Sequence, residues 1–388
     1  MWQQLAYMEA KMAAVIDSIS TDAETGGLIF GGKTLHPLWL RERVTEAKVF
    51  DLISHQRLYE TADLDPSLAI NSAKLSDNRH KLSVEFSDGY KAVFDIETLA
   101  HELGLAKNPE ELPIPKSWKG SLKFRRFNWN DLNDPAQMKE LLTAYFENAF
   151  CIMDDTPADR DSLKEHARRF GFLRVTNFGE IFNVETKPSA TDLAYTDLAL
   201  ANHTDNPYRW PVPSIQYLHC LTNEVDGGLS TLVDGMAVAE AIADENQDWA
   251  NSLETTPVRF RYEGPTGIYE DTAPLIARDY RGHVNHIRFS PRLDFVPALD
   301  PQTLTTFYAA RSRMNQLAND LAFQIQFPFK PGTLLMMNNY RLFHGRTAFN
   351  GKQGYRHLQG CYIDHDGPQC LYRLLARGHV ETYVLRES

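Results

Sequence analysis

Residues 191–220 read TDLAYTDLALANHTDNPYRWPVPSIQYLHC and contain the triplet His203-Thr204-Asp205. In an extended segment, side chains two residues apart leave the same face, so the imidazole of His203 and the carboxylate of Asp205 can bind one metal ion together. A third ligand must come from elsewhere, and the best candidate is His344, within the run NNYRLFHGR. Two histidines and one carboxylate on one face of a metal are typical of iron(II) sites that keep positions open for a co-substrate and O2.

An arginine follows the third candidate ligand. Arg356 lies twelve residues after His344. Its planar guanidinium matches the far carboxylate of an acid that chelates the metal through its other end. The His-x-Asp spacing alone is weak evidence, because a chain with this many histidines and aspartates contains such a pair by chance. On spacing alone, a polar loop at the end of a strand is an equally good interpretation.

The composition is that of an ordinary globular protein. The chain has 388 residues, of which 43% are hydrophobic and 23% charged, which is enough for a large core and favours two structural units over one. The formal net charge is −11, and no cluster of Lys and Arg of the kind that binds nucleic acid is visible. We therefore expect no nucleic-acid partner.

Three features predict a cytoplasmic protein without a membrane partner. The four cysteines have no CxxC spacing and are expected to be mainly reduced thiols in the core. Glu9 and Lys11 interrupt the apolar residues of the N-terminus, which therefore lacks the order of a secretory signal. No apolar run approaches the roughly 20 residues that cross a bilayer.

The N-terminal residues predict a small β-rich domain. Apolar and polar residues alternate over 82–86 and again over 92–94, with the turn Ser-Asp-Gly at 87–89 between them, which is the pattern of a β-hairpin. A short helix is expected near 96–103. We place this domain at 1–104 and expect an apolar core to hold it together.

A proline-punctuated linker over 105–120 then marks a domain boundary, and the larger domain covers 121–388. Its strands are separated by Gly- and Pro-rich turns, and its candidate ligands lie far apart in sequence, which suits a double-stranded β-helix, or jelly-roll. The expected fold class is α+β, a jelly-roll core with helices. A short strand is expected at 150–153, and helices are expected from Pro135 onward and over 161–170, 236–242 and 301–322.

Six short motifs spread over the larger domain are AYT (194–196), HTD (203–205), IQYLHC (215–220), GGLSTLVDG (227–235), NNYRLFHGR (338–346) and RHLQGCY (356–362). Together they resemble the γ-butyrobetaine and trimethyllysine hydroxylase branch of the Fe(II)/2-oxoglutarate oxygenases, within the taurine-dioxygenase-like superfamily. The resemblance covers nearly the whole chain, more faintly at the N-terminus.

The resemblance implies an iron centre. By motif, His203, Asp205 and His344 are the iron(II) ligands, Arg356 anchors 2-oxoglutarate, and Ser230 sits where relatives place a hydroxyl that adds a contact. For Ser230, a turn residue bonded to its own backbone is an equally good interpretation. The co-substrates implied are 2-oxoglutarate and O2, with ascorbate as a stimulant and succinate and CO2 as products. Because Asp205 keeps the carboxylate that related halogenases lack, hydroxylation is expected.

Some members of that branch carry a structural zinc in the N-terminal domain. There, a cysteine cluster follows a WLR segment like the one at 39–41, and a histidine lies further on. In this chain the segment is followed by Val44, and no cysteine occurs before Cys151. The thiolates that such a site needs are absent. We therefore expect no structural zinc in this domain.

Relatives hold the substrate's trimethylammonium group in a cage of aromatic rings, because this cation cannot donate hydrogen bonds. By motif the cage maps to Phe178, Phe182, Tyr195 and Tyr362. The first two are four residues apart and are expected on one helical face. Without the resemblance, aromatic residues at such positions are more often ordinary core residues.

The other end of the pocket departs from the γ-butyrobetaine hydroxylases. Asp192 stands where those enzymes have Asn and matches the trimethyllysine enzymes instead. In the run IRFSPR, Ser290 and a proline replace the Asn pair that helps to hold a carboxylate. Asn202, Arg288, Ser290 and Arg292 offer donors that suit a dianionic tetrahedral group. Surface ion pairing is the alternative for the two arginines.

These departures favour hydroxylation of 2-(trimethylammonio)ethylphosphonate at C1. One alternative is a γ-butyrobetaine or trimethyllysine hydroxylase, and another is a non-catalytic betaine-binding protein. A metal-dependent hydrolase on the same ligands is a further rival, against which Arg356 argues. In each case the expected partner is a small zwitterion, and the resemblance implies a homodimer.

Overall fold

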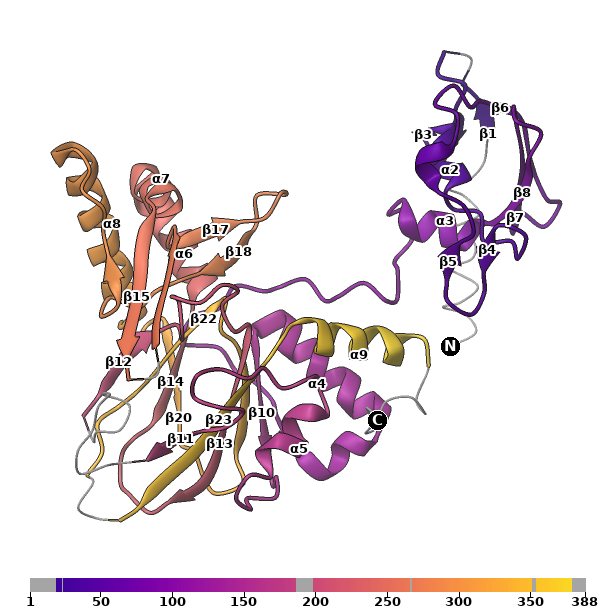
Figure 1. Ribbon diagram of the computed structural model, residues 1–388. Helices are drawn as coiled ribbons and strands as arrows, with labels where there is room; N and C mark the ends of the chain where they lie inside the picture. The colour runs from indigo at the N-terminus through magenta and orange to yellow at the C-terminus, as the bar shows by residue number, and fades with distance from the viewer. Residues whose placement is uncertain (1–18, 23, 186–197, 266, 351–353, 379–388) are drawn as a thin grey trace. The chain divides into compact units, whose positions relative to one another are not determined.

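The chain forms two compact units, Met1–Glu111 and Leu112–Ser388, each with its own core (Figure 1). The boundary between them lies inside the stretch 105–120 that was expected to be a linker. The computed structural model describes residues 19–22, 24–185, 198–265, 267–350 and 354–378.

The first unit contains two three-stranded antiparallel sheets and a two-stranded ribbon. Leu28, Phe30, Leu82 and Phe86 are fully buried in its core. The hairpin predicted from the sequence is confirmed, and Gly89 in its turn adopts the left-handed conformation (φ 81°) that favours glycine. The elements are β1 (Ile19–Thr21), β2 (Leu28–Phe30), β3 (Lys33–Leu35), α2 (Pro37–Arg41), β4 (Phe50–Asp51), β5 (Gln56–Arg57), β6 (Ile70–Leu75), β7 (Lys81–Phe86), β8 (Lys91–Asp95) and α3 (Ile96–Glu102).

Two sheets form the centre of the second unit. The larger has the strand order β11-β23-β13-β21-β10-β9 and the smaller has the order β12-β22-β14-β20. Strands that follow one another in the chain change sheets, from β11 to β12, from β13 to β14 and from β20 through to β23, so the predicted jelly-roll core is confirmed. The strands are β9 (Arg126–Asn128), β10 (Phe150–Asp154), β11 (Phe182–Glu185), β12 (Leu200–His203), β13 (Ile215–Asn223), β14 (Ser230–Asp234), β20 (Gln324–Phe327), β21 (Leu334–Asn338), β22 (Leu342–Arg346) and β23 (Arg356–Ile363).

Successive side chains of each strand point to opposite faces, so the sheets contribute to separate cores. Leu232 of the smaller sheet packs with Leu335 and Met337 of the larger sheet. On the other face of the larger sheet, Met336 and Tyr217 pack against the helices α4 (Pro135–Asn148), α5 (Leu163–Arg168) and α9 (Asp366–Ala376), which lie beside that sheet in Figure 1.

A long excursion between β14 and β20 forms a further core. Three helices pack there against short strands, with Phe260, Phe289 and Phe307 fully buried among them. The elements are α6 (Gly235–Glu245), α7 (Gln247–Thr255), β15 (Val258–Gly264), β16 (Gly267–Ala273), β17 (Ile276–Arg278), β18 (Val284–Ile287), β19 (Asp294–Phe295) and α8 (Pro301–Ala318).

The predicted helices are present, with shifted ends. The Asp134 side chain accepts a hydrogen bond from the backbone N–H of Ala136 at the start of α4, and Ala149 ends that helix in the left-handed conformation (φ 66°). The other predicted helices are α3, α5, α6 and α8. The sequence pattern missed α2, α7 and α9.

The helical face predicted for Phe178 and Phe182 is wrong. Phe182 begins β11, where it pairs with Gly360 of β23, and Phe178 lies in the turn that precedes this strand. The ring of Phe182 occupies the space that a Cβ at position 360 would need. Glycine at that position therefore allows a large ring to cross the neighbouring strand, which spacing along the chain does not reveal.

Three of the four cysteines, Cys151, Cys220 and Cys361, are buried free thiols, as expected. The fourth, Cys370 on α9, is an exposed free thiol. In the part of the chain that the structure describes, no helix has the length and apolar character needed to span a bilayer.

Candidate metal centre

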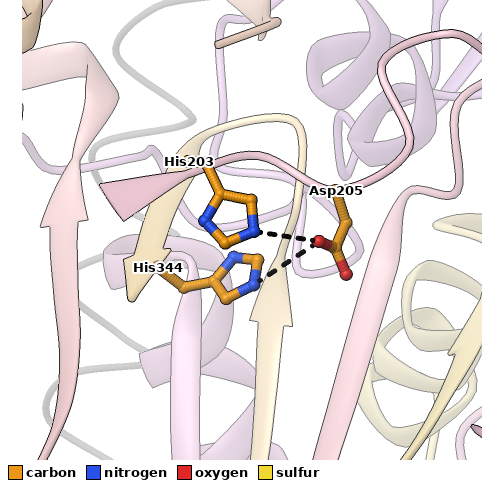
Figure 2. A group of neighbouring side chains, drawn as sticks. All are labelled: His203, Asp205 and His344. Atoms are coloured by element: carbon orange, nitrogen blue, oxygen red, sulfur yellow. Dashed lines mark ion pairs between the residues drawn. The ribbon is translucent and has the colours of Figure 1, made fainter. Parts of the chain in front are cut away.

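The metal-ligand triad is brought together by strand pairing. His203 at the end of β12 stands directly opposite His344 on the antiparallel strand β22, and Asp205 follows two residues after His203. Nε2 of His203 lies 3.4 Å from Oδ1 of Asp205, and Nε2 of His344 lies 3.6 Å from the same oxygen (Figure 2). Within the described ranges, this is the only group of three or more His, Cys, Asp or Glu side chains arranged to hold a metal.

The backbone fixes the triplet His203-Thr204-Asp205. Nδ1 of His203 lies 2.9 Å from the carbonyl oxygen of Ala201, which can only accept, so Nδ1 carries the proton and Nε2 keeps a lone pair toward the cluster. The backbone N–H of Thr204 donates to the carbonyl of Phe289 (2.8 Å), and the N–H of Phe289 donates to the Thr204 hydroxyl (2.9 Å). The metal triplet is thereby tied to the segment that follows β18.

The two oxygens of Asp205 have separate roles. Oδ2 accepts hydrogen bonds from Nε2 of Gln216 (2.6 Å) and from the hydroxyl of Tyr362 (2.7 Å). The backbone N–H of Asp205 donates to Oδ1 of Asn339 (2.8 Å). Oδ1 of Asp205 faces both imidazoles, so the carboxylate is set to bind a metal through one oxygen.

The protonation states suit a divalent cation. Burial alone would raise the pKa of Asp205, but His344, His203 and the Tyr362 hydroxyl outweigh burial and hold it well below its usual range. Burial lowers the pKa of His344 to about 4. At neutral pH the site therefore offers an ionised carboxylate and a neutral His344 imidazole, which are the forms that bind metal.

Arg356 is placed to receive an anion. It begins β23, is 4% exposed, and its Nε is buried without a hydrogen-bond partner in the described part of the chain. No carboxylate of the described residues pairs with it, and a buried cation without a counter-charge is costly. The ring of Phe349 lies 5.6 Å from its guanidinium and 4.7 Å from that of Arg346, which is two residues from His344. Ser230 is buried opposite Arg346 on the neighbouring strand. These residues fit an acid bound beside the metal.

Two of the four predicted cage residues lie together beside the candidate ligands. The ring centroids of Phe182 and Tyr362 are 5.3 Å apart, and the Tyr362 hydroxyl reaches Asp205. Phe178 is 37% exposed and instead contacts Tyr262 of β15, with ring centroids 6.0 Å apart. The structure therefore brings together one half of the expected cage.

Two of the donors predicted for the substrate's anion are engaged within the protein. Nδ2 of Asn202 donates to the carbonyl of Ala318 (2.7 Å), and its Oδ1 accepts from the hydroxyl of Thr231 (2.7 Å). Arg288 is 4% exposed and forms an ion pair with Asp271. A role for either in substrate binding stays a prediction.

The other residues predicted to contact the substrate are Ser290, Asp192, Tyr195 and Arg292. Ser290 is buried one residue after Phe289, close along the chain to the contact with Thr204. Asp192 and Tyr195 lie outside the described residues. Arg292 is exposed, and its charge contributes to lowering the pKa of His344, although burial is the main cause.

Four polar residues around Asp205 were not found from the sequence. Gln216 and Asn339 contact Asp205, whereas Asn206 and Tyr208 reach it through Tyr362. A signal for Gln216 was present, since it is a polar residue in the apolar run IQYLHC. The run HTDNPY gave no comparable signal for Asn206 and Tyr208.

The chain matches the family model described as "Taurine catabolism dioxygenase TauD, TfdA family" over residues 112–362. It is 32% identical to the γ-butyrobetaine dioxygenase of Pseudomonas sp. (strain AK-1), over 88% of this chain and 89% of that protein. It is 27% identical to the human γ-butyrobetaine dioxygenase, over 88% and 92% of the two chains. The trimethyllysine dioxygenase of Meyerozyma guilliermondii is 23% identical, over 85% and 87%.

Solved structures with a similar fold include PvcB, described as an Fe, α-ketoglutarate-dependent oxygenase from an isonitrile synthetic pathway. It is 20% identical with a TM-score of 0.47, and the match covers 67% of this chain and 94% of that chain. Asparagine oxygenase (AsnO) is 15% identical with a TM-score of 0.47, and the match covers 59% and 78%.

Proposed function

Because the chain belongs to the taurine catabolism dioxygenase TauD, TfdA family, we propose that His203, Asp205 and His344 hold iron(II) for the hydroxylation of a small trimethylammonium carboxylate such as γ-butyrobetaine. The enzyme is an Fe(II)- and 2-oxoglutarate-dependent dioxygenase. Bound iron(II) supplies the redox chemistry, in which O2 and 2-oxoglutarate yield succinate and CO2 and one oxygen atom enters a C–H bond of the substrate.

One observation supports this assignment most directly. Three ligand atoms of His203, Asp205 and His344 lie within 4.8 Å of one another on a strand pair and the residues beside it. This set is the facial arrangement used for non-haem iron(II). The second oxygen of Asp205 is occupied by Gln216 and Tyr362, so the carboxylate does not need to bind the metal through both oxygens.

Each remaining residue has a task that its surroundings support. The buried guanidinium of Arg356 receives the far carboxylate of 2-oxoglutarate, because a charge-assisted pair is the compensation that a buried cation needs. The rings of Phe182 and Tyr362 receive the trimethylammonium group through cation–π attraction. Both rings are largely or partly buried, which keeps bulk water from the cation.

A carboxylate substrate is favoured over a phosphonate. The phosphonate hypothesis relied partly on free donors from Asn202 and Arg288, which are engaged by Ala318, Thr231 and Asp271. The relatives reported above are named γ-butyrobetaine dioxygenase and trimethyllysine dioxygenase, and both γ-butyrobetaine and trimethyllysine carry a trimethylammonium group and a carboxylate. γ-Butyrobetaine is proposed first because the bacterial relative shares 32% identity, against 23% for the yeast trimethyllysine enzyme.

A substrate panel tests the proposal. Purified protein with Fe(II), 2-oxoglutarate and O2 is assayed for succinate with γ-butyrobetaine, trimethyllysine and 2-(trimethylammonio)ethylphosphonate in parallel. Choline, which has the cation but no acid group, is the control. We expect the highest kcat/KM with γ-butyrobetaine and a product heavier by one oxygen atom. Faster turnover of the phosphonate would refute γ-butyrobetaine as the preferred substrate. If none of the three compounds gave succinate, hydroxylation of a trimethylammonium substrate at this site would be refuted.

Two further predictions from the sequence belong to this proposal. A homodimer and a cytoplasmic location are both expected for an enzyme of this kind. Sedimentation of the purified protein tests the first, and fractionation of cells tests the second.

A further inference from the structure

Tyr362 belongs to the proposed cation site through its ring and contacts the candidate metal centre through its hydroxyl. Its ring lies 5.3 Å from the ring of Phe182 with the planes 30° apart, and its hydroxyl donates to Oδ2 of Asp205 over 2.7 Å. The side chain is 4% exposed. One side chain therefore joins the proposed cation site to a proposed metal ligand, and a shift of its hydroxyl would also shift its ring.

Sheet register supports this arrangement. Tyr362 on β23 stands directly opposite Gln216 on β13, so the two side chains lie on the same face as near neighbours. Both donate to the same oxygen of Asp205, Gln216 over 2.6 Å. The position of the carboxylate is thus determined by two adjacent strands of the larger sheet.

A second layer holds the hydroxyl of Tyr362. Nδ2 of Asn206 donates to the Tyr362 oxygen (2.9 Å), and Oδ1 of Asn206 accepts from the hydroxyl of Tyr208 (2.6 Å). An ionised Asp205 can only accept, so the Tyr362 proton points to it and the nitrogen of Asn206 must face Tyr362. The direction of all three hydrogen bonds is therefore fixed.

The backbone of Asn206 is part of this layer. Asn206 adopts a left-handed conformation (φ 52°), which asparagine tolerates better than most residues. It and Tyr208 are 7% and 4% exposed. Tyr208 in turn stacks on Tyr262 of the β15–β16 hairpin, with ring centroids 5.1 Å apart. The chain of contacts runs from that hairpin to Asp205.

We propose that Tyr362 couples binding of the substrate's trimethylammonium group to binding of the metal, with Asn206 and Tyr208 as positioning residues. The proposal deepens the proposed function and rests on it. A metal held by His203, Asp205 and His344 would restrict the Asp205 carboxylate further than its hydrogen bonds do, and through Oδ2 the hydroxyl and the ring of Tyr362. The ring would then lose less conformational entropy when the cation arrives, and the cation would bind more tightly. By linkage, the cation strengthens metal binding by the same factor.

Binding measurements without turnover test the coupling. The dissociation constant of γ-butyrobetaine is measured by calorimetry for metal-free protein and for protein loaded with Zn(II), which does not react with O2. In the unaltered protein we expect binding about tenfold tighter with Zn(II), within the range typical of coupled sites. The coupling is expressed as the ratio of the dissociation constant without metal to that with Zn(II). Tyr362→Phe keeps the ring and removes the hydroxyl, so we expect this ratio to fall to about one.

Two variants address the positioning residues. Asn206→Gly keeps a left-handed backbone accessible and removes the amide, and Tyr208→Phe removes only the outermost donor. Each should lower the ratio about threefold, in proportion to the loss of one neutral hydrogen bond. Tyr145→Phe is the matched control, because that buried hydroxyl in α4 has no hydrogen-bond partner among the residues that the structure describes, and its ratio should equal that of the unaltered protein.

The outcomes separate the two proposals. If γ-butyrobetaine binds and the ratio is the same in Tyr362→Phe as in the unaltered protein, the coupling is refuted and the proposed function stands. If γ-butyrobetaine binds neither form of the unaltered protein, the proposed function and the coupling both fail. A ratio near one already in the unaltered protein also refutes the coupling.

Discussion

His203 and His344 stand opposite each other on the antiparallel strands β12 and β22, with their ring centroids 4.5 Å apart. The closeness of two residues so distant in sequence follows from register, because directly opposed residues of an antiparallel pair project from the same face. The pairing of β12 with β22 in the smaller sheet therefore brings two of the three candidate ligands together. Asp205 completes the metal site from the segment that leaves β12.

Replacing His344 with alanine should abolish metal binding. Only His203 and Asp205 would remain, so the affinity for Fe(II) or Zn(II) should fall by more than the roughly 10–100-fold loss seen when only an outer-shell partner is removed. His357→Ala is the control, because His357 on β23 is bonded to Asn183 and does not belong to the cluster. Equal metal affinity in His344→Ala and the unaltered protein, measured by calorimetry, would remove His344 from the site.

Replacing Arg356 should affect the stability of the ligand-free protein and of the protein with 2-oxoglutarate in different ways. Its buried guanidinium lacks a carboxylate partner among the described residues, so Arg356→Met should leave the melting temperature of the metal-free protein unchanged or raise it. The same variant should lose the stabilisation that 2-oxoglutarate gives, because a buried charge pair is worth about 2–5 kcal/mol when one partner is removed.

A thermal-shift titration with and without 2-oxoglutarate measures both effects. Arg356→Lys keeps the charge but not the planar fork and should recover only part of the ligand-induced shift. A large fall in the melting temperature of ligand-free Arg356→Met would mean that the guanidinium has a structural partner instead.

Some residues within the motifs that carry the family resemblance have a structural task, and the pair Asp234 and Arg341 is the clearest case. Asp234 is fully buried at the end of β14 and accepts two hydrogen bonds from the guanidinium of Arg341, over 2.8 and 2.7 Å. It also caps α6 through the N–H of Met236 and accepts from the N–H of Trp118. Asp234→Asn should therefore lower the free energy of unfolding by about 3–5 kcal/mol, because Arg341 would stay buried without a counter-charge.

Urea denaturation measures this loss. The double variant Asp234→Leu with Arg341→Met removes both charges and should be more stable than Asp234→Asn. The fraction of Asp234→Asn that remains folded should bind Zn(II) normally, since neither residue touches the triad. Normal stability with lost metal binding would contradict a purely structural role.

The sequence was most informative where function required particular residue types at short spacing. The spacing of His203 and Asp205, the run around His344 and the family resemblance of the motifs together predicted which side chains meet. The jelly-roll followed from the wide separation of these ligands. The hairpin at β7 and β8 and the cap at Asp134 were found for a similar reason, since their signals are local.

The residues that support the site were harder to predict because their partners are set by register. Gln216 and Tyr362 meet only because β13 and β23 pair in one particular alignment. Phe178 and Phe182 are spaced as on a helix, but pairing of β11 with β23 outweighs that spacing. Arg288 was expected to be a substrate donor, with surface ion pairing as the alternative; it forms an ion pair, although a buried one, with Asp271. Asp271 comes from a strand whose position the sequence does not define.

A buried histidine outside the metal site allows us to predict how the stability of the protein changes as the pH falls. His219 on β13 is fully buried, and its Nε2 lies 2.9 Å from the hydroxyl of Thr156. That hydroxyl donates to the carbonyl of Gly332 over 2.7 Å, so it must accept from Nε2–H of His219. Nδ1 is then unprotonated and buried, with no hydrogen-bond partner in the ranges that the structure describes, and burial lowers the pKa of His219 from 6.5 to about 4.

The protein should lose stability in acid partly through His219. The unfolded chain binds a proton at this residue near pH 6.5 and the folded protein only near pH 4, so between these values the unfolded state holds more protons and the free energy of unfolding falls as pH falls. The loss approaches about 3 kcal/mol at pH 4, at roughly 1.4 kcal/mol per pH unit. His219→Gln cannot titrate, and the difference between its denaturation curves and those of the unaltered protein at pH 7 and pH 5 isolates this one group. Identical pH slopes for the two proteins would show that His219 is not buried in its neutral form.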